Sequence, residues 1–513
     1  MLPVPAYRPH PLDARLAAAL PAGSLYAVGG RVRDELRLAA GEAVDPRQDL
    51  DYVVVGVELD DLRGRLQGLG SVDVVGASFA VLKATIDGTT VDIALPRRER
   101  SSGPGHRAFE VQSGPDIPLV DDLGRRDFRM NMLARSLPDG RLLDPYGGQA
   151  DIRARRIDLL RPEAFAEDPL RMLRCAQFAA RFGYEVTPPT AAALQAAAEL
   201  VGTVSSERVR DELEKLLEQA PRPSIGLELL RTAGLLDYVL PELTEGIGVE
   251  QNEWHAYDVY HHALATVDAA PAGDRLLRWA ALLHDVGKPR TKEGPHFYRH
   301  EQIGAQISQA LLQRLRLAGD DTATVEHLVR QHMYVADPQL SDAALRRFIR
   351  RVEPAHLARQ FALRRADIVG SGLPARSDRN ERFEARVWAE LARRPPLRVA
   401  DLALDGEAIV NAMIAKGLAP ATFRGDARVG AALRWLLEQV TDRPERNDLT
   451  TLPDLLNEYL DALASGQAPA SVLFHVKHQL TPAAGGSSGV NDTGSHNRAR
   501  ESKGRRRQEH DGR

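Results

Sequence analysis

The sequence predicts an α/β domain followed by a long region that is helical almost throughout. Between residues 24 and 144, short apolar runs alternate with glycine-rich turns, which is typical of strands and helices around a sheet. After Asp151, apolar residues recur at helical spacing. The chain has 513 residues, too many for one compact core, so several domains are expected.

Composition places the chain among ordinary globular proteins. Hydrophobic residues make up 43% and charged residues 27%. The single cysteine, Cys175, excludes an internal disulfide framework and fits a reducing cytoplasm, so we expect a cytoplasmic protein. The segment Met1–Leu12 does not resemble a signal peptide, and no apolar run is long enough to cross a membrane. The net charge of −4 means that any RNA contact must come from local arginine clusters.

The expected elements follow from these patterns. In the first domain, strands are expected at Leu25–Val28, Tyr52–Val55, Ala80–Ile86 and Val91–Leu95, with a helix at Arg31–Leu38. Further on, helices are expected at Leu170–Phe182, Thr190–Leu200, Arg208–Gln219 and Ser224–Ala233, and across Tyr260–Met333, Ala343–Ile368 and Gly406–Gln439.

Candidate phosphate- and metal-binding residues gather near the first two strands. Gly29 and Gly30 end the first strand, and Arg33 follows in the next helix, which suits an approaching phosphate. Asp49 and Asp51 stand two residues apart at the start of the next strand, so both carboxylates face one side, as paired Mg²⁺ ions require. Asp92, on a later strand, is either a third metal ligand or an ordinary edge residue.

Two arginine-rich segments follow. The segment Arg97–Phe109, with its glycine, serine and proline residues, reads as a basic loop that either covers a nucleotide or is simply solvated. Arg125 and Arg126, beside Asp127, suit a triphosphate clamp that an acidic neighbour holds in place. Isolated, either segment would be read as an exposed charge run.

A helix start supplies a carboxylate next to a guanidinium. Asp168 and Arg171 lie three residues apart around Pro169, so they share one face of the helix, and Arg174 follows one turn on. One acceptor beside one donor matches the hydrogen-bonding edges of cytosine and adenine. The simpler interpretation is helix capping alone.

Histidines are concentrated in the helical middle region. Neighbouring histidine and aspartate form a good divalent-metal pair when other helices add further ligands. The series comprises His261, His262, His284, Asp285, His300, His332 and Asp367.

With these motifs in this order, the sequence resembles the class II tRNA nucleotidyltransferases of the polymerase-β-like superfamily, with an HD domain. The resemblance implies Asp49 and Asp51 as the catalytic Mg²⁺ ligands. It implies nucleotide binding by Gly30, Arg33, Arg126, Asp168, Arg171 and Arg174, and HD metal binding by His262, His284, Asp285 and Asp367, with His300 and His332 as extra ligands. The HD site would take a second divalent transition metal.

The resemblance also implies a domain plan and substrates. It predicts a nucleotidyltransferase head over residues 1–150, a helical RNA-binding neck over 151–250, an HD domain over 251–370, a helical C-terminal region over 371–480 and a disordered basic tail over 481–513. The expected partners are the tRNA 3′ end, CTP and ATP, with no membrane, and a homodimer is left open. Two departures from the family pattern are Gln177, where an arginine is expected, and Met132, where alanine is usual.

The expected activity is template-independent addition of CCA to tRNA. Addition of A alone and poly(A) synthesis stay open, because they share the same chemistry. A phosphohydrolase whose main activity lies in the HD domain is disfavoured by the intact Asp49 and Asp51, and a non-catalytic RNA-binding protein is disfavoured because both metal constellations are complete.

Overall fold

A computed structural model describes residues 9–44, 50–75, 81–101, 109–374 and 377–466 of the chain. Asp49, Ala80, most of the predicted loop Arg97–Phe109 and the predicted disordered tail 481–513 lie outside these ranges. The chain divides into two compact units, between Arg394 and Pro395.

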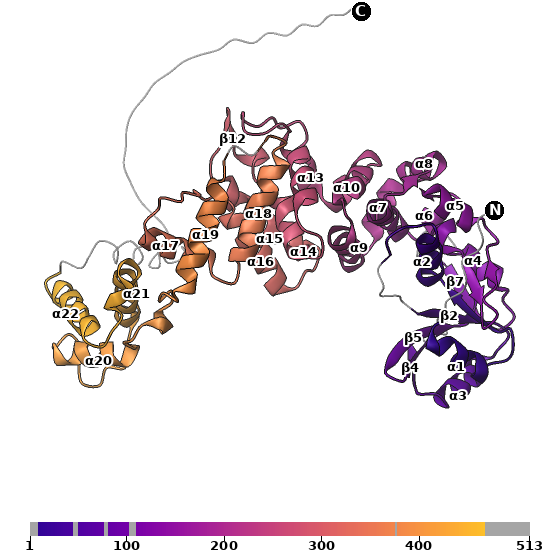
Figure 1. The fold of residues 1–513 in the computed structure, drawn as a ribbon, viewed down its shortest axis with the longest axis horizontal. Helices are drawn as coiled ribbons and strands as arrows, with labels where there is room; N and C mark the ends of the chain where they lie inside the picture. The colour runs from indigo at the N-terminus through magenta and orange to yellow at the C-terminus, as the bar shows by residue number, and fades with distance from the viewer. Residues whose placement is uncertain (1–8, 45–49, 76–80, 102–108, 375–376, 467–513) are drawn as a thin grey trace, which may run out of the picture. The chain divides into compact units, whose positions relative to one another are not determined.

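The first unit begins with a mixed seven-stranded sheet in the order β3-β4-β5-β2-β1-β8-β9 (Figure 1). Its strands are β1 Leu25–Val28, β2 Asp51–Val54, β3 Ser71–Val75, β4 Val81–Ile86, β5 Thr89–Ala94, β8 Ala134–Ser136 and β9 Leu142–Leu143. The α/β head predicted from the sequence is therefore present, and the four predicted strands match β1, β2, β4 and β5 to within two residues at each end in the described part of the chain.

The two faces of the sheet have different surroundings. Tyr52, Leu82 and Ile93 point into the main core, where helices α1 Pro11–Ala19, α2 Gly30–Ala39 and α3 Leu59–Gln67 also pack. On the opposite face, Val28 and Val53 pack with Leu119 and Leu123 of helix α4 Leu119–Gly124. Over β4 and β5 this second face carries the exposed residues Lys83 and Asp92. One half of the face is thus covered by a helix, and the other half presents polar side chains.

The arginine-rich segment after β5 is not a simple loop. Its first residues form strand β6 Arg97–Ser101, which pairs antiparallel with β7 Phe109–Ser113. The expectation of a loop across Arg97–Phe109 was therefore wrong at both ends. The sequence did not indicate the first strand because charged residues fill it, and charged side chains do not prevent strand pairing in a two-stranded ribbon.

Helices follow the head, as predicted. The linking elements are the 3₁₀ turn η2 Arg129–Asn131, α5 Gly148–Ala154, the strand pair β10 Arg156–Ile157 and β11 Glu185–Val186, and α6 Ala164–Glu167. The larger helices are α7 Leu170–Phe182, α8 Pro188–Ala197, α9 Ser206–Gln219 and α10 Pro223–Thr232, with short α11 Leu236–Val239 and α12 Pro241–Thr244. Gly226 allows α10 to pack closely, because a Cβ there would meet Leu216 Cδ1 at 2.5 Å and the Ala176 carbonyl oxygen at 2.7 Å.

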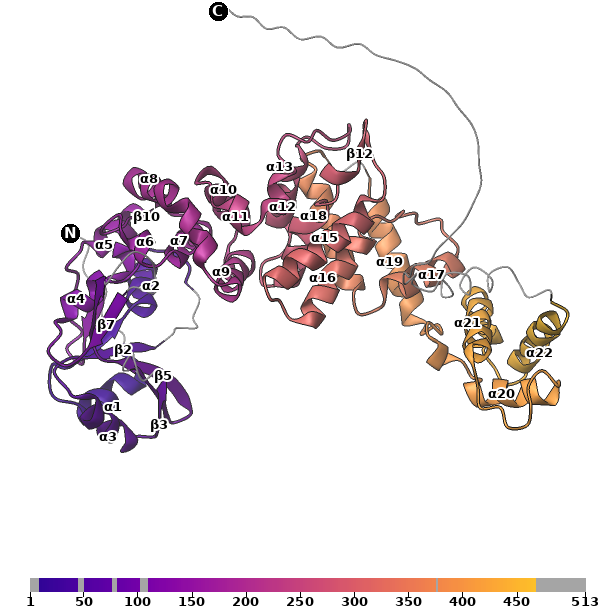
Figure 2. The same ribbon diagram turned by 180° about the vertical axis from the view of Figure 1, so that it is seen from behind.

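The histidine-rich region is a helical bundle with one small hairpin (Figure 2). Its elements are α13 Val259–Ala269, α14 Arg275–Leu283, hairpin β12 Lys292–Glu293 and β13 His296–Phe297, α15 His300–Arg314, α16 Gly319–Gln331, α17 Asp342–Val352, α18 Leu357–Gly370 and α19 Arg379–Ala392. The stretch Ala343–Ile368, expected to be helical, is divided into α17 and α18 by residues 353–356.

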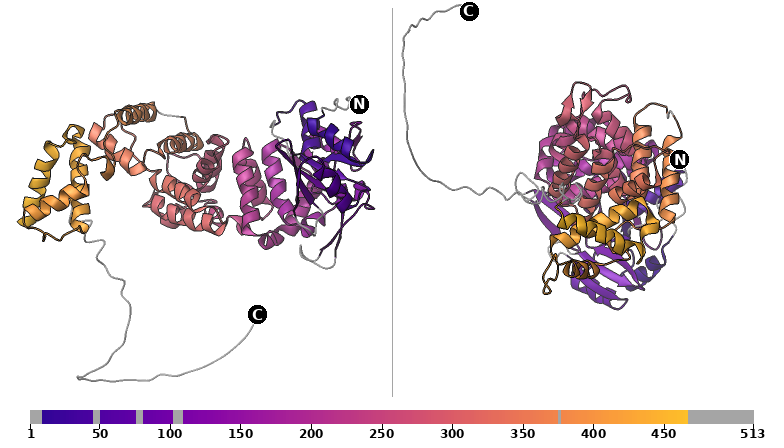
Figure 3. Two further views of the ribbon diagram at one scale, coloured as in Figure 1. Left: turned by 90° about the horizontal axis from the view of Figure 1, so that it is seen from below. Right: turned by 90° about the vertical axis from the view of Figure 1, so that its left-hand side faces the viewer.

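The second unit is a small helical domain, drawn in yellow and orange in Figure 3. It contains α20 Gly406–Ala415, α21 Ala427–Asp442 and α22 Thr451–Ala464. Buried Ile409, Leu436 and Leu456, one from each helix, meet in its own core. Among the described helices of both units, none combines the length and apolarity that crossing a bilayer requires.

Candidate functional site

Two carboxylates stand side by side on the open half of the sheet. β2 and β5 are parallel, and their register pairs Asp51 with Asp92. Asp92 is half exposed and Asp51 is partly exposed, so both side chains are accessible. Oxygen ligands in this arrangement suit Mg²⁺. Asp92 thus shares the face and the row of Asp51, and its strand lies inside the sheet rather than at an edge. Asp49, two residues before Asp51, lies outside the described residues.

Gly29 lies close to both the Asp51 carboxylate and the Arg126 guanidinium. Its φ of +71° favours glycine, and it caps helix α2. A Cβ at this position would lie 3.0 Å from Arg126 Nη1 and 3.5 Å from Asp51 Oδ2. The backbone end of β1, the Arg126 guanidinium and the Asp51 carboxylate therefore converge on one point, as a bound triphosphate with its metal ion requires.

Arg33 is fixed on the same helix. Its Nη1 donates to Asn131 Oδ1 at 2.9 Å, and its Nε and Nη2 donate to Asp34. Its guanidinium also lies over the ring of Phe182, 4.8 Å from the centroid. Arg33 is thus held between the second half of the head and helix α7. Gly30 is the first residue of α2, and its backbone lies beside the Arg33 side chain.

A buried carboxylate joins Asn131 and Arg174. Asp127 accepts hydrogen bonds from Asn131 Nδ2, the Phe128 backbone N–H and Arg174 Nε, each at 2.8 Å. Burial opposes ionisation, but the Arg174 charge and these hydrogen bonds hold the pKa of Asp127 below its ordinary value. The Asp127 charge in turn raises the pKa of Arg174. Arg174 keeps about a third of its side chain exposed, so it can still contact a ligand.

Asp122 organises the arginine pair predicted to clamp a triphosphate. It accepts from Arg125 Nε at 3.1 Å, from Arg126 Nη2 at 3.4 Å and from the Arg97 backbone N–H at 3.1 Å. The Asp122 side chain is buried, whereas a fifth of Arg126 remains exposed. Asp122 is thus the acidic neighbour that holds these arginines.

Asp168 and Arg171 turn to different partners. Asp168 accepts from Arg208 Nη2 at 3.2 Å through both carboxylate oxygens. Arg171 donates to the Arg125 carbonyl at 2.5 Å and to the Ala164 carbonyl at 3.2 Å. Arg171 is buried and Asp168 is partly exposed. The carboxylate is therefore open to a ligand, but the guanidinium is occupied by backbone carbonyls.

The two departures noted in the sequence are both buried. Gln177 is 2% exposed, and among the described residues its Nε2 has no hydrogen-bond partner. Met132 packs with Val28 and Val53 beneath helix α4. Met132 therefore belongs to the core, and Gln177 is buried within helix α7.

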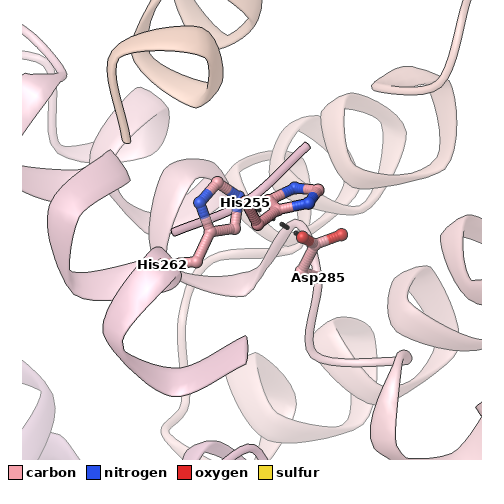
Figure 4. A group of neighbouring side chains, drawn as sticks. All are labelled: His255, His262 and Asp285. Carbon is pink, nitrogen blue, oxygen red and sulfur yellow. Dashed lines mark ion pairs between the residues drawn. The ribbon is translucent and has the colours of Figure 1, made fainter. Parts of the chain in front are cut away.

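A second constellation lies in the helical bundle. His262 of α13, His284 and Asp285 after α14, and Asp367 of α18 bring their side chains together (Figure 4 shows His262 and Asp285). His262 Nε2 lies 3.0 Å from His284 Nε2, 3.4 Å from Asp285 Oδ2 and 3.2 Å from Asp367 Oδ1. All four residues that the resemblance implies as HD ligands are thus assembled at one place.

The other carboxylate oxygen of Asp285 faces a second group. Asp285 Oδ1 lies 3.4 Å from His300 Nε2 and 3.6 Å from His332 Nε2, and these two nitrogens are 3.2 Å apart. His284 and Lys288 hold the pKa of Asp285 well below its usual range, although burial works against ionisation. The two oxygens of Asp285 therefore face two separate groups of histidine nitrogens.

The hydrogen bonds behind the histidines favour metal ions. His284, His300 and His332 each place Nδ1 within 2.9 Å of a backbone carbonyl, at Ala281, Phe297 and Val329. An Nδ1–H that donates to a carbonyl leaves Nε2 with its lone pair, so the Nε2 lone pairs of His300 and His332 face each other 3.2 Å apart. A divalent cation between them satisfies both, and carbonyl-oriented imidazoles are common behind bound metals.

One member of this constellation was missed from the sequence. His255 forms a further ligand group with His262 and Asp285 (Figure 4). Burial and the nearby Lys288 charge lower the pKa of His255 to about 4, so its imidazole is neutral at neutral pH. Lys288 Nζ lies 2.6 Å from Asp285 Oδ2 and 2.6 Å from Gln251 Oε1. The spacing of His255, seven residues before His262, was the available signal.

Three protein-family models match successive parts of the chain. Residues 25–158 match the poly(A) polymerase head domain, residues 183–247 match a probable RNA- and SrmB-binding site of polymerase A, and residues 254–369 match the HD domain. Nucleotidyltransferase head and HD domains both imply dependence on divalent metal ions.

Curated relatives and solved structures extend over most of the chain. A multifunctional CCA protein of Cupriavidus metallidurans is 37% identical over 66% of this chain and 82% of its own length. Another, of Nitrosococcus oceani, is 37% identical over 75% of this chain and 95% of its own length. The Bacillus stearothermophilus CCA-adding enzyme in complex with CTP has a TM-score of 0.63 at 23% identity, covering 86% of this chain and 94% of that chain. The Thermotoga maritima CCA-adding enzyme complexed with tRNA has a TM-score of 0.53 at 19% identity, covering 88% and 96%. These structures share its fold.

Proposed function

The chain belongs to the multifunctional CCA protein family, and from this premise we propose how its head completes the 3′ end of tRNA. It is a nucleotidyltransferase that adds C and A from CTP and ATP. The observation that carries the assignment of its active site is the convergence of Asp51, Arg126 and the Gly29 backbone within 3.5 Å of one point.

Asp51 and Asp49 would hold Mg²⁺, with Asp92 as a third oxygen ligand. The ion supplies activation of the RNA 3′-hydroxyl and stabilisation of the departing pyrophosphate. Asp51 and Asp92 fit this role, because both are oxygen donors on one face of the sheet and both are accessible.

The arginines hold the triphosphate on the β1 side of Asp51. Gly30 permits close approach, and positive charge comes from Arg33 of helix α2, Arg126 after helix α4 and Arg174 of helix α7. A carboxylate or an amide orients each guanidinium before the nucleotide binds. Binding therefore costs less side-chain conformational entropy. Asp168 and Arg171 select C or A. Two of the five guanidinium N–H donors of Arg171 go to the Ala164 and Arg125 carbonyls, which fix the side chain and leave other donors for a base.

The direct test uses three tRNA transcripts, lacking CCA, ending in C and ending in CC, each with CTP, ATP or both. CCA addition to the first transcript with a stop after A is the expected result. Addition only to the transcript ending in CC would make this an A-adding specialist, and long A ladders would make it a poly(A) polymerase. Asp51→Asn serves as the inactive control, with Asp61→Asn, an exposed acid of helix α3, as the matched active one.

We propose a second activity, metal-dependent phosphohydrolysis, in the HD domain. The bridging position of Asp285 between His262 and His284 on one side and His300 and His332 on the other favours it. These residues would hold transition-metal ions, which supply a metal-bound water as nucleophile. Lys288, beside Asp285, would pair with the phosphate.

Hydrolysis of bis(p-nitrophenyl) phosphate with Mn²⁺, Co²⁺ or Ni²⁺ tests the second activity. Asp285→Asn should abolish it and leave CCA addition intact, whereas Asp51→Asn should do the reverse. Loss of both activities in either variant would contradict two separate sites. No hydrolysis with any of the three metals would leave the bundle a structural domain.

A further inference from the structure

A row of charged side chains crosses the open half of the sheet. The strand registers pair Asp51 with Asp92, Asp92 with Lys83, and Lys83 with Asp73. The row therefore contains one cation among three carboxylates. Lys83 Nζ lies 3.8 Å from Asp92 Oδ1, and the two side chains are 47% and 50% exposed. Such an exposed pair contributes little to stability, so folding alone gives weak reason for the lysine.

The strand order places Asp92, Lys83 and Asp73 on the side of β2 that lies away from the proposed triphosphate site. β1, with Gly29 and the nearby Arg126, lies on one side of β2, whereas β5 and β4 lie on the other. Adjacent strands are about 4.8 Å apart, which puts Lys83 roughly 10 Å from Asp51, on the side away from Gly29. The row therefore extends away from the phosphate-binding arginines.

The geometry of nucleotidyl transfer indicates which substrate lies next to this row of charged side chains. The attacking 3′-hydroxyl and the leaving pyrophosphate lie roughly in line through the α-phosphate. If the pyrophosphate leaves toward Gly29 and Arg126, the RNA end enters from the side of β5 and β4. The RNA backbone next to that hydroxyl carries phosphates, and a flexible lysine on the entry side suits one of them.

We propose that Lys83 binds a backbone phosphate near the 3′ end of the RNA and so positions the attacking hydroxyl. This inference rests on the proposed function of the head. Asp92 holds the ammonium while RNA is absent. Coordination of a metal ion by Asp92 would draw that carboxylate away from Lys83 and free the ammonium for the phosphate. Asp73, on the other side of Lys83, opposes the RNA by like charge and limits its affinity.

The test measures binding of a tRNA transcript ending in CC by fluorescence anisotropy, with Mg²⁺ and without nucleotide, between about 50 and about 200 mM KCl. Lys83→Gln should raise the Kd several-fold and reduce the slope of log Kd against log salt by about 0.7 to 0.9, the amount expected for one phosphate contact. Asp73→Asn should lower the Kd. The KM for ATP at saturating RNA should stay unchanged in both variants.

Arg65→Gln is the matched control. Arg65 pairs with Asp61 at 2.9 Å, with side chains 42% and 52% exposed, so its loss also removes one exposed cation from the head. Its helix α3 packs Leu62 and Leu66 into the core on the opposite face of the sheet, so RNA affinity should not change.

Three outcomes would overturn the proposal. One is an unchanged Kd and salt slope in Lys83→Gln, and another is an equal change in Arg65→Gln. The third is a raised KM for ATP with unchanged RNA affinity, which would assign Lys83 to the triphosphate. A separate extension assay tests the function proposed for the head. Failure of the unmodified protein to extend the transcript in that assay would refute the proposed function.

Discussion

Arg174 Nε donates to Asp127 Oδ2 at 2.8 Å, so the helix that follows the head is tied to the carboxylate that also orients Asn131. Asn131 Oδ1 in turn accepts from Arg33 on helix α2. This chain of contacts connects two arginines proposed to bind phosphate, through one buried carboxylate. A change at Asp127 should therefore affect both.

The pH dependence of stability should report this ion pair. The pKa of Asp127 is lowered in the folded protein, so its contribution to stability is fully present above its unfolded pKa of about 3.9 and is lost as the pH falls through the lower folded value. The melting temperatures of the unmodified protein and of Asp127→Asn should differ most above about pH 4, and this difference should become smaller in more acidic solution. A difference independent of pH would contradict the assignment.

Asp51→Asn should abolish transfer while sparing the fold. The carboxylate is partly exposed at the start of β2, so its replacement by an isosteric amide leaves the sheet intact. Loss of a metal ligand should reduce kcat by at least about 100-fold. Single-turnover addition of A to a transcript ending in CC measures this. Retention of more than a tenth of the activity would exclude Asp51 as a metal ligand.

Metal content should separate the two ligand groups of the HD domain. The unmodified protein loaded with Mn²⁺ should retain about two ions in the bundle, because Asp285 presents one oxygen to each group. His332→Ala should lose one of them, and Asp285→Asn should lose both. Elemental analysis after gel filtration in Mg²⁺-free buffer gives the count. Equal metal content in His332→Ala and the unmodified protein would contradict a second position.

The N-terminal helix should matter for stability through a buried ion pair. Asp13 accepts from Arg31 Nη1 at 2.8 Å, from Arg31 Nη2 at 2.6 Å and from the Tyr52 hydroxyl at 2.7 Å, with Asp13 and Arg31 almost fully buried. Asp13→Asn removes the nearer counter-charge of the buried Arg31 guanidinium and leaves Glu35 Oε1 at 3.5 Å, which should lower the free energy of unfolding by up to roughly 3–5 kcal/mol. Urea denaturation checks this.

The exposed ion pair of Arg65 and Asp61 on helix α3 serves as the comparison for the buried pair of Asp13. Arg65→Gln removes a surface ion pair and should cost only about 0.2–1 kcal/mol. Similar losses in the two variants would show that the Asp13 pair is solvated in solution.

Local patterns in the sequence were enough for the head and its motifs. The strand at Leu25–Val28 and the α/β class were confirmed, because apolar alternation and glycine turns act over a few residues. The histidine–aspartate pair at His284 and Asp285 was visible for the same reason. The ribbon at β6 and β7 was missed, because its pairing depends on residues on either side of a connecting segment.

Partners far apart in the chain were not predictable. The sequence did not show that Asp127 pairs with Arg174, 47 residues further along the chain. It placed Asp168 and Arg171 on one face, but not the carbonyls that occupy Arg171. Hydrogen-bond partners depend on how elements pack, and one turn of helix or one residue of register changes them.

The sequence by itself determined which residue types stand at each strand end and helix start, and therefore the order of domains and the kinds of chemistry available. The tertiary structure alone decided that Asp92 stands beside Asp51, that Asp285 faces two histidine groups and that Lys83 continues the row on the open sheet. The physical reason is that backbone periodicity is a local property, whereas strand register and helix packing are set by burial of apolar faces from distant parts of the chain.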